Sequence, residues 1–205
     1  TGGVYSGPGV TDDGNGMTYS FDPAAATAGT HSITYTFTDT NGCSDSASDD
    51  VEVFPLPTVT FTAPADLCID VGVQTSLGDG MPTGGVYSGP GVTDDGNGMT
   101  YSFDPAAATA GTHSITYNFT DSIGCSDSAS DDVEVFPLPV VSFTAPADMC
   151  VDAGTMSGLG GGTPPEGTQT GDMGVYSGTG VADDGNGMTY SFDPAAAGVG
   201  TQTIT

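Results

Sequence analysis

The sequence has 205 residues and combines 26 Asp and Glu with no Lys and no Arg, for a net charge of −26. Proteins that bind nucleic acids or anionic membrane surfaces do so through Lys and Arg, so both kinds of partner are excluded. No apolar run reaches the ~18 residues of a bilayer span, so we expect no membrane insertion. The 36% hydrophobic residues, 33 Gly and 14 Pro favour a folded chain of short strands and turns.

The chain contains an internal repeat with a period of 82 residues. Residues 2–57 recur at 84–139 with three differences in 56 positions. A third copy begins at Gly174, 89 residues after its counterpart, because the segment 160–172 holds seven extra residues. The Gly, Thr and Pro content of this segment is typical of a surface loop.

Pro-Leu-Pro motifs at 55–57 and 137–139 mark the joints between repeats. Alternating prolines favour extended backbone and stiffen a linker, so we expect successive domains to form a stiff rod. This division predicts the C-terminal part of a repeat at 1–55, a complete repeat at 56–137 and the N-terminal part of a repeat at 138–205. We interpret the chain as a section of a much longer array.

Within one repeat the apolar residues have a period of two, which is typical of strands. Val59 and Phe61 alternate with Thr in an expected first strand, and Ile115, Tyr117 and Phe119 alternate with polar residues in a later one. About seven short strands per repeat, with turns between them, predict an all-β fold of tandem immunoglobulin-like β-sandwiches.

The four cysteines favour an oxidising, extracellular setting. Cys68 and Cys125 lie in the complete repeat, and a bridge between them would tie its first strands to its last. In that case Cys43 and Cys150 have partners outside this sequence. The alternatives are Cys43–Cys68 with Cys125–Cys150, which would lock neighbouring domains together, and free thiols.

An acidic loop, Asp-Asp-Gly-Asn-Gly, occurs in all three copies. Closely spaced oxygen ligands on flexible backbone suit Ca²⁺, whereas Asp-Gly and Asn-Gly are also the preferred residues of a hairpin tip. Both interpretations stay open. The candidate calcium ligands are Asp12, Asp13, Asn15, Asp94, Asp95, Asn97, Asp183, Asp184 and Asn186.

A second acidic cluster runs along the expected last strand towards a linker. Its carboxylates either share a cation between domains or keep an edge strand from pairing with other chains. A third acidic group, in which each Asp precedes a Pro, is predicted to form turns. The cluster comprises Asp127, Asp131, Asp132 and Glu134, with Asp148 and Asp152 beyond the linker, and the turn-forming residues are Asp22, Asp104 and Asp193.

The sequence supports no catalytic site, and we predict that the protein is not an enzyme. The only histidines are His31 and His113, and the third copy has Gln202 at that position. The carboxylates occupy turns and an edge strand, and there is no Trp to stack on a sugar.

The motifs of residues 84–92, Phe103-Asp104-Pro105, residues 111–117 and Gly124-Cys125 before a final strand and Pro-Leu-Pro resemble the Ig-like repeats of giant Bacteroidota cell-surface proteins. These include gliding-motility adhesins and the grappling-hook filaments of a marine predatory bacterium. The resemblance covers the whole chain and implies dedicated secretion, surface attachment and calcium dependence.

We therefore expect a structural repeat of an extracellular adhesive filament or stalk, giving length, stiffness and protease resistance for surface attachment or cell–cell contact. The expected partners are further copies, through lateral filament contacts, or none in a single-chain stalk. Other cells or surfaces would be bound by a region outside this sequence. The alternative function is a calcium-dependent glycan- or cell-binding module.

Overall fold

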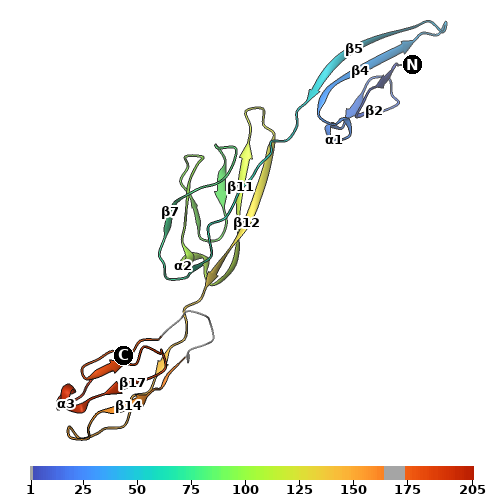
Figure 1. Ribbon diagram of the computed structural model, residues 1–205. Helices are drawn as coiled ribbons and strands as arrows, with labels where there is room; N and C mark the ends of the chain where they lie inside the picture. Colours follow the sequence, from blue (N-terminus) through green and yellow to red (C-terminus); the bar gives the residue numbers. More distant parts are fainter. Residues whose placement is uncertain (1, 164–173) are drawn as a thin grey trace. The chain divides into compact units, whose positions relative to one another are not determined.

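The computed structural model describes residues 2–163 and 174–205 and has an all-β fold (Figure 1). The chain divides into two compact units, Thr1–Pro137 and Leu138–Thr205. Its helices in the described ranges are single turns of four residues, and none of them is long and apolar enough to cross a membrane.

Residues 56–137 form two sheets, which is consistent with a β-sandwich. One sheet has the strand order β6-β12-β11-β8 and the other β7-β10-β9. The antiparallel pair of β11 and β12 is the longest in this repeat and is visible at the centre of Figure 1. The elements are β6 (Leu67–Cys68), β7 (Gln74–Leu77), β8 (Val86–Ser88), β9 (Val92–Asp94), β10 (Tyr101–Phe103), α2 (Pro105–Ala108), β11 (Gly111–Thr120) and β12 (Ser126–Phe136).

The core of this repeat is an aromatic cluster between the two sheets. The ring of Tyr87 lies 4.5 Å from that of Tyr101 and 4.6 Å from that of Tyr117, between ring centroids. Phe103 and Ile115 are fully buried beside them. Burial of such apolar side chains stabilises a fold by about 1.5–3 kcal/mol each, so this cluster is the main source of stability in the repeat.

Residues 2–55 repeat the second half of this arrangement. The sheets are β1-β4-β5 and β2-β3, and Ile33 pairs with Asp49 in the same register as Ile115 with Asp131. The elements are β1 (Val4–Ser6), β2 (Val10–Asp12), β3 (Tyr19–Phe21), α1 (Pro23–Ala26), β4 (Gly29–Thr38) and β5 (Ser44–Val53).

The unit Leu138–Thr205 has a smaller core, made of Tyr176, Tyr190 and Phe192. Of the longer loop predicted at 160–172, residues 164–172 lie outside the described residues. The elements are β13 (Ser142–Phe143), β14 (Met156–Leu159), β15 (Gly162–Thr163), β16 (Val181–Asp183), β17 (Tyr190–Phe192) and α3 (Pro194–Ala197).

One strand of the complete repeat differs from the prediction. The first strand expected at 58–62 is reduced to a single bridge between Thr60 and Met81. The nearby prolines Pro57 and Pro64 have no N–H to donate to a longer ladder. The last strand carries the acidic cluster from Asp127 to Glu134 as expected, and its polar stretch from Ser126 pairs with β11.

Candidate functional site

Side chains of the acidic loop after β9 accept hydrogen bonds from backbone N–H groups of the loop and of β8. Asp94 Oδ2 accepts from the N–H of Tyr87 at 2.8 Å, and Oδ1 accepts from that of Gly96 at 2.8 Å. Asn97 Oδ1 accepts from the N–H groups of Met99, at 2.7 Å, and Thr100, at 2.8 Å. Both acidic and amide side chains therefore shape the turn.

The same contacts recur in the other two copies. Asp95 Oδ2 accepts from the Thr100 hydroxyl at 2.6 Å, and its counterparts do the same. The corresponding residues are Asp12, Asp13 and Asn15 in the first copy, and Asp183, Asp184 and Asn186 in the third. Among the described residues no group of three or more His, Cys, Asp or Glu side chains is arranged to hold a metal ion. The hairpin-tip interpretation accounts for these contacts, and the calcium site stays a prediction.

One carboxylate and one backbone N–H of the last strand contact the first segment of the repeat. Asp131 Oδ2 accepts from the N–H of Ala63 at 3.0 Å, and the N–H of Glu134 donates to Asp66 Oδ1 at 2.9 Å. Asp127 accepts from the N–H of the next residue along β12. This strand is thus tied to the segment before β6. Asp148 and Asp152 lie in an irregular stretch of the unit Leu138–Thr205, and a cation shared between domains stays a prediction.

The Asp residues that precede Pro are helix N-caps. Asp104 Oδ1 accepts from the N–H of Ala106 at 3.0 Å and of Ala107 at 3.3 Å, and Pro105 fills the first helical position. Asp22 and Asp193 cap α1 and α3 in the same way. Their predicted turn-forming role is confirmed.

The tip of the β4–β5 hairpin is closed by Asp39. Its Oδ1 accepts from the N–H of Asn41 at 2.8 Å and of Cys43 at 2.9 Å. The hydrogen bond from the Cys43 N–H is the main cause that lowers the pKa of Asp39. Desolvation of the carboxyl group acts in the opposite direction. This carboxylate is therefore used to hold a turn.

The histidines also have structural contacts. His113 Nε2 donates to the carbonyl of Thr109 at 2.8 Å, and His31 Nε2 to that of Thr27 at 2.9 Å. Each ring therefore fastens the start of a long strand to the end of the preceding helical turn. These contacts give the imidazoles a local structural role.

The predicted bridge between Cys68 and Cys125 is wrong. Cys68 pairs in register with Phe136 at the end of β12, whereas Cys125 directly precedes Ser126 at the beginning of that strand. Eleven residues at ~3.3 Å each separate the two sites by about 36 Å, and a disulfide needs Cα atoms about 4.4–6.8 Å apart. All four cysteines are free, so the alternative pairing with Cys43 and Cys150 is not formed either.

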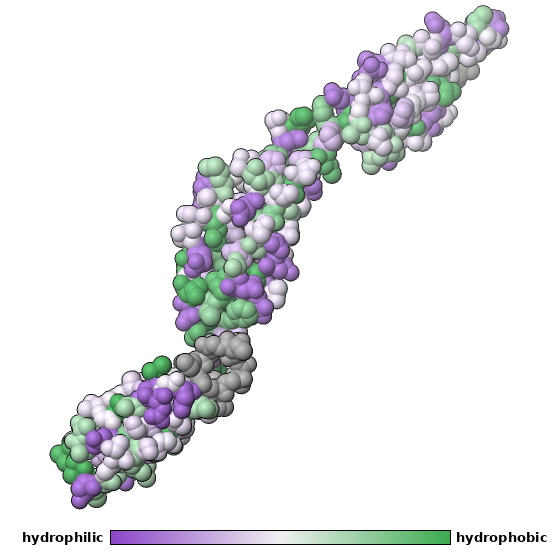
Figure 2. Space-filling view, viewed as in Figure 1, coloured by the Kyte–Doolittle hydropathy of each residue, from purple (hydrophilic) through white to green (hydrophobic). Residues whose placement is uncertain are grey.

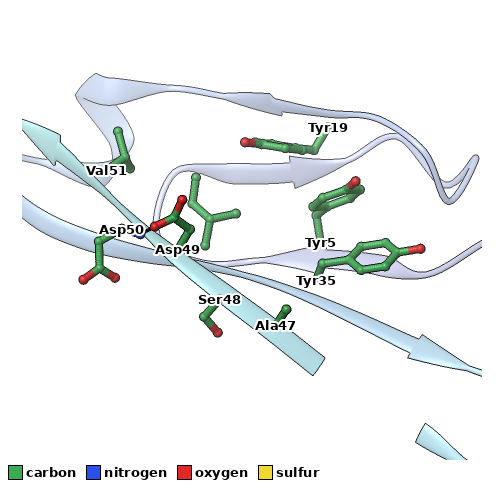
Figure 3. Close-up of a pocket in the computed structure, with 9 residues that line it drawn as sticks. Tyr5, Tyr19, Tyr35, Ala47, Ser48, Asp49, Asp50 and Val51 are labelled. Atoms are coloured by element: carbon green, nitrogen blue, oxygen red, sulfur yellow. Dashed lines mark hydrogen bonds between the residues drawn. The ribbon is translucent and has the colours of Figure 1, made fainter. Parts of the chain in front are cut away.

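The sequence patterns did not predict an open groove of about 340 Å³ on residues 2–55 (Figure 3). Tyr5, Tyr19 and Tyr35 line it from β1, β3 and β4, and Asp49 and Val51 line it from β5. An alignment of the repeats could have predicted this groove. Residues 2–55 match 84–137 and include no counterpart of 57–83, the segment that covers the equivalent side chains in the complete repeat.

No protein-family model matches the chain, and no curated protein matches it either.

Proposed function

We propose that this chain is a structural repeat of an extracellular adhesive filament or stalk. Its immunoglobulin-like domains would be joined by Pro-Leu-Pro linkers into a stiff rod that gives length for surface attachment or cell–cell contact. The main support is the use of polar side chains: the repeated carboxylates hold turns and helix caps in each copy, and Asp131 holds a contact between strand and preceding segment in the complete repeat.

The near-identity of the copies also supports a structural role. Residues 2–57 and 84–139 differ at three of 56 positions, all three exposed in the complete repeat, and the other exposed positions are unchanged. Repeat arrays that perform one mechanical task have this property, whereas a set of distinct receptors would diverge at the surface. In Figure 2 hydrophilic and hydrophobic residues are interspersed over the visible face.

The composition fits the same role. A chain without Lys and Arg has no site for trypsin-like proteases, which favours persistence outside a cell. A charge of −26 with no internal cation needs salt or divalent ions to screen it, as in a saline exterior. The resemblance to Bacteroidota surface repeats points to the same location.

The alternative function, a calcium-dependent glycan- or cell-binding module, has less support. A sugar-binding surface would need exposed aromatic side chains in each repeat. In residues 56–137 the tyrosines Tyr87, Tyr101 and Tyr117 are at most 3% exposed. They are therefore core residues of the complete repeat.

Sedimentation velocity together with small-angle X-ray scattering tests the proposal. The chain is measured at low concentration in reducing buffer with millimolar calcium, the order at which weak extracellular sites fill. A high frictional ratio and a rod-like scattering profile are expected, and a compact particle would overturn the rod. Antibodies against the chain should label extended structures outside intact producing cells; labelling confined to the interior would overturn the location.

A further inference from the structure

The chain contains four Asn-Gly dipeptides in two structural settings. Three of them, at Asn15, Asn97 and Asn186, lie in the acidic loops, and the fourth, at Asn41, lies at the tip that joins β4 and β5 (Figure 1). Because Gly has no Cβ, the backbone nitrogen that follows these Asn residues can approach the side-chain carboxamide carbon without steric hindrance. The same chemistry is therefore available at four places, and the fold decides where it occurs.

The acidic loops hold the Asn carboxamide on both of its polar atoms. Asn97 Oδ1 accepts from the N–H groups of Met99, at 2.7 Å, and Thr100, at 2.8 Å, while its Nδ2 donates to the Thr100 hydroxyl at 2.7 Å. Asn15 and Asn186 have the same three hydrogen bonds. The carboxamide carbon can turn towards the next backbone nitrogen only after these bonds have broken.

The backbone that follows Asn97 is also fixed in the complete repeat. The N–H of Gly84 donates to the carbonyl of Gly98 at 2.7 Å. A Cβ on Gly98 would lie 2.7 Å from the Cα of Gly84, so the two backbones are in close contact. The peptide group that contains the attacking nitrogen is therefore restrained together with the carboxamide.

Asn41 has much weaker restraints. Asn41 and Gly42 are exposed, and a Cβ on Gly42 would have no atom within 4 Å. Asn41 Oδ1 accepts from no donor among the described residues, and Nδ2 donates to Asp39 Oδ2 at 3.3 Å. The N–H of Gly42 donates to the Asp39 carbonyl at 3.1 Å. Both bonds are longer than the usual 2.9–3.0 Å of an N–H···O bond, so they oppose rearrangement less than the three short bonds at Asn97 do.

We propose that Asn41 is a site of spontaneous modification, where the side-chain amide is lost, whereas the fold protects Asn15, Asn97 and Asn186. The backbone nitrogen of Gly42 attacks Cγ of Asn41; the N–Cγ bond forms, the Cγ–Nδ2 bond breaks, and ammonia leaves with the proton of the Gly42 nitrogen. Water then adds to one of the two carbonyl carbons of the cyclic imide and opens the ring. The product is aspartate or isoaspartate, and its acid proton is taken up by the ammonia as ammonium.

The modification changes the charge and the contacts of this tip. It adds one negative charge to the −26 of the chain and replaces the amide that donates to Asp39 by a carboxylate. Two like charges then face each other, which weakens the turn. The complete repeat has Ile123 in place of Asn41, although Asp121 holds that tip by the same two backbone bonds. The reaction is therefore restricted to the first of these two tips.

This inference goes beyond the proposed function, because it concerns the chemistry of the chain whether or not the chain belongs to a rod. The test is incubation of the whole chain at mildly alkaline pH, in reducing buffer made with ¹⁸O-labelled water. Peptic peptides are then analysed by mass spectrometry for exchange of the amide group for a labelled oxygen. Asn41 should react at least about tenfold faster than Asn97, because three short hydrogen bonds must first open at Asn97. Equal rates in the folded chain would overturn the proposal.

Two controls separate the fold from the local sequence. In concentrated urea the four sites should react at similar rates, and a difference as large as in the folded chain would overturn protection by the fold. Ile123→Asn places Asn-Gly-Cys at the tip of the complete repeat, where Ile123 is 57% exposed. This new site should react as fast as Asn41, and a rate as slow as that of Asn97 would overturn the role of the tip. Circular dichroism verifies that the variant is folded.

Discussion

The backbone N–H of Ala63 donates a 3.0 Å hydrogen bond to the carboxylate of Asp131, 68 residues further along the chain. A second bond of the same sequence separation joins the N–H of Glu134 to Asp66 at 2.9 Å. The two contacts run in opposite senses, so each half of the repeat supplies one carboxylate and one donor. Asp131 on β12 and Asp66 before β6 therefore help to hold the first segment of the repeat in place.

We predict that Asp131→Ala lowers the free energy of unfolding of the complete repeat by about 1 kcal/mol. A hydrogen bond to a charged group contributes about 1.5–3 kcal/mol, and exposure to solvent reduces this value. Hydrogen exchange measured by mass spectrometry should show faster exchange in peptides that contain Ala63. Asp132→Ala is the control, because its side chain lies on the other side of β12. Equal protection of Ala63 in the two variants would contradict a role of the Asp131 carboxylate.

The contacts of Asp94 lead to a prediction about the acidic loops. Asp94→Ala removes the acceptor for two backbone N–H groups and should destabilise the repeat by about 1–2 kcal/mol. Asp95→Ala loses only contacts with exposed hydroxyl groups, so it should lower the free energy of unfolding by less than Asp94→Ala does. Differential scanning calorimetry measures both variants.

Calorimetry with calcium and with a chelator distinguishes a turn from a metal site. If the loop is a hairpin tip, the effect of Asp94→Ala is the same in both buffers. A parent chain whose melting temperature falls on chelation, together with a double variant Asp94→Asn and Asp95→Asn that no longer responds, would instead establish the calcium site.

The period-two pattern predicted β11 correctly, whereas the same pattern at Val59 and Phe61 marks core-facing side chains on a segment with a single bridge. Ile115, Tyr117 and Phe119 lie in β11 as expected, because their alternation reflects one buried and one solvated face. The polar start of β12 could not be predicted in this way. Its residues Ser126–Asp132 form a strand through backbone pairing with β11 and have few apolar side chains to mark it.

The candidate sites were harder to predict because they depend on where distant segments meet. The spacing of the cysteines in the sequence suggested a bridge between Cys68 and Cys125. The parallel pairing of β6 with the end of β12 instead places the two residues at opposite ends of β12. The contact of Asp131 with Ala63 is equally non-local. Local roles were predictable: Asp104 before Pro105 is a cap because only neighbouring N–H groups are involved.

Tyr101 leads to a prediction for alkaline pH. Burial, aided by the nearby Tyr87 and Asp79, raises the pKa of Tyr101 from its ordinary value of 10.0 to about 12. Between these values the folded chain keeps a proton that the unfolded chain has lost, so the free energy of unfolding falls as pH rises from 10 to 12. The tyrosinate absorbance, followed against pH, should contain a late component that Tyr101→Phe removes. Alkaline unfolding that is unchanged by this substitution would contradict the assignment.

The positions of the cysteines give the last prediction. Since Cys68 and Cys125 lie at opposite ends of β12, oxidation should link thiols of different chains and leave no bridge between these two residues within a monomer. Each new disulfide passes two electrons to dissolved dioxygen or another oxidant and releases two protons. The products are separated by non-reducing electrophoresis, and the monomer band is digested with pepsin and analysed by mass spectrometry. Cys125→Ser should change the free energy of unfolding by less than about 0.5 kcal/mol, because no native bridge is lost. A peptide pair containing Cys68 joined to Cys125 in the monomer band would show that β12 does not separate them.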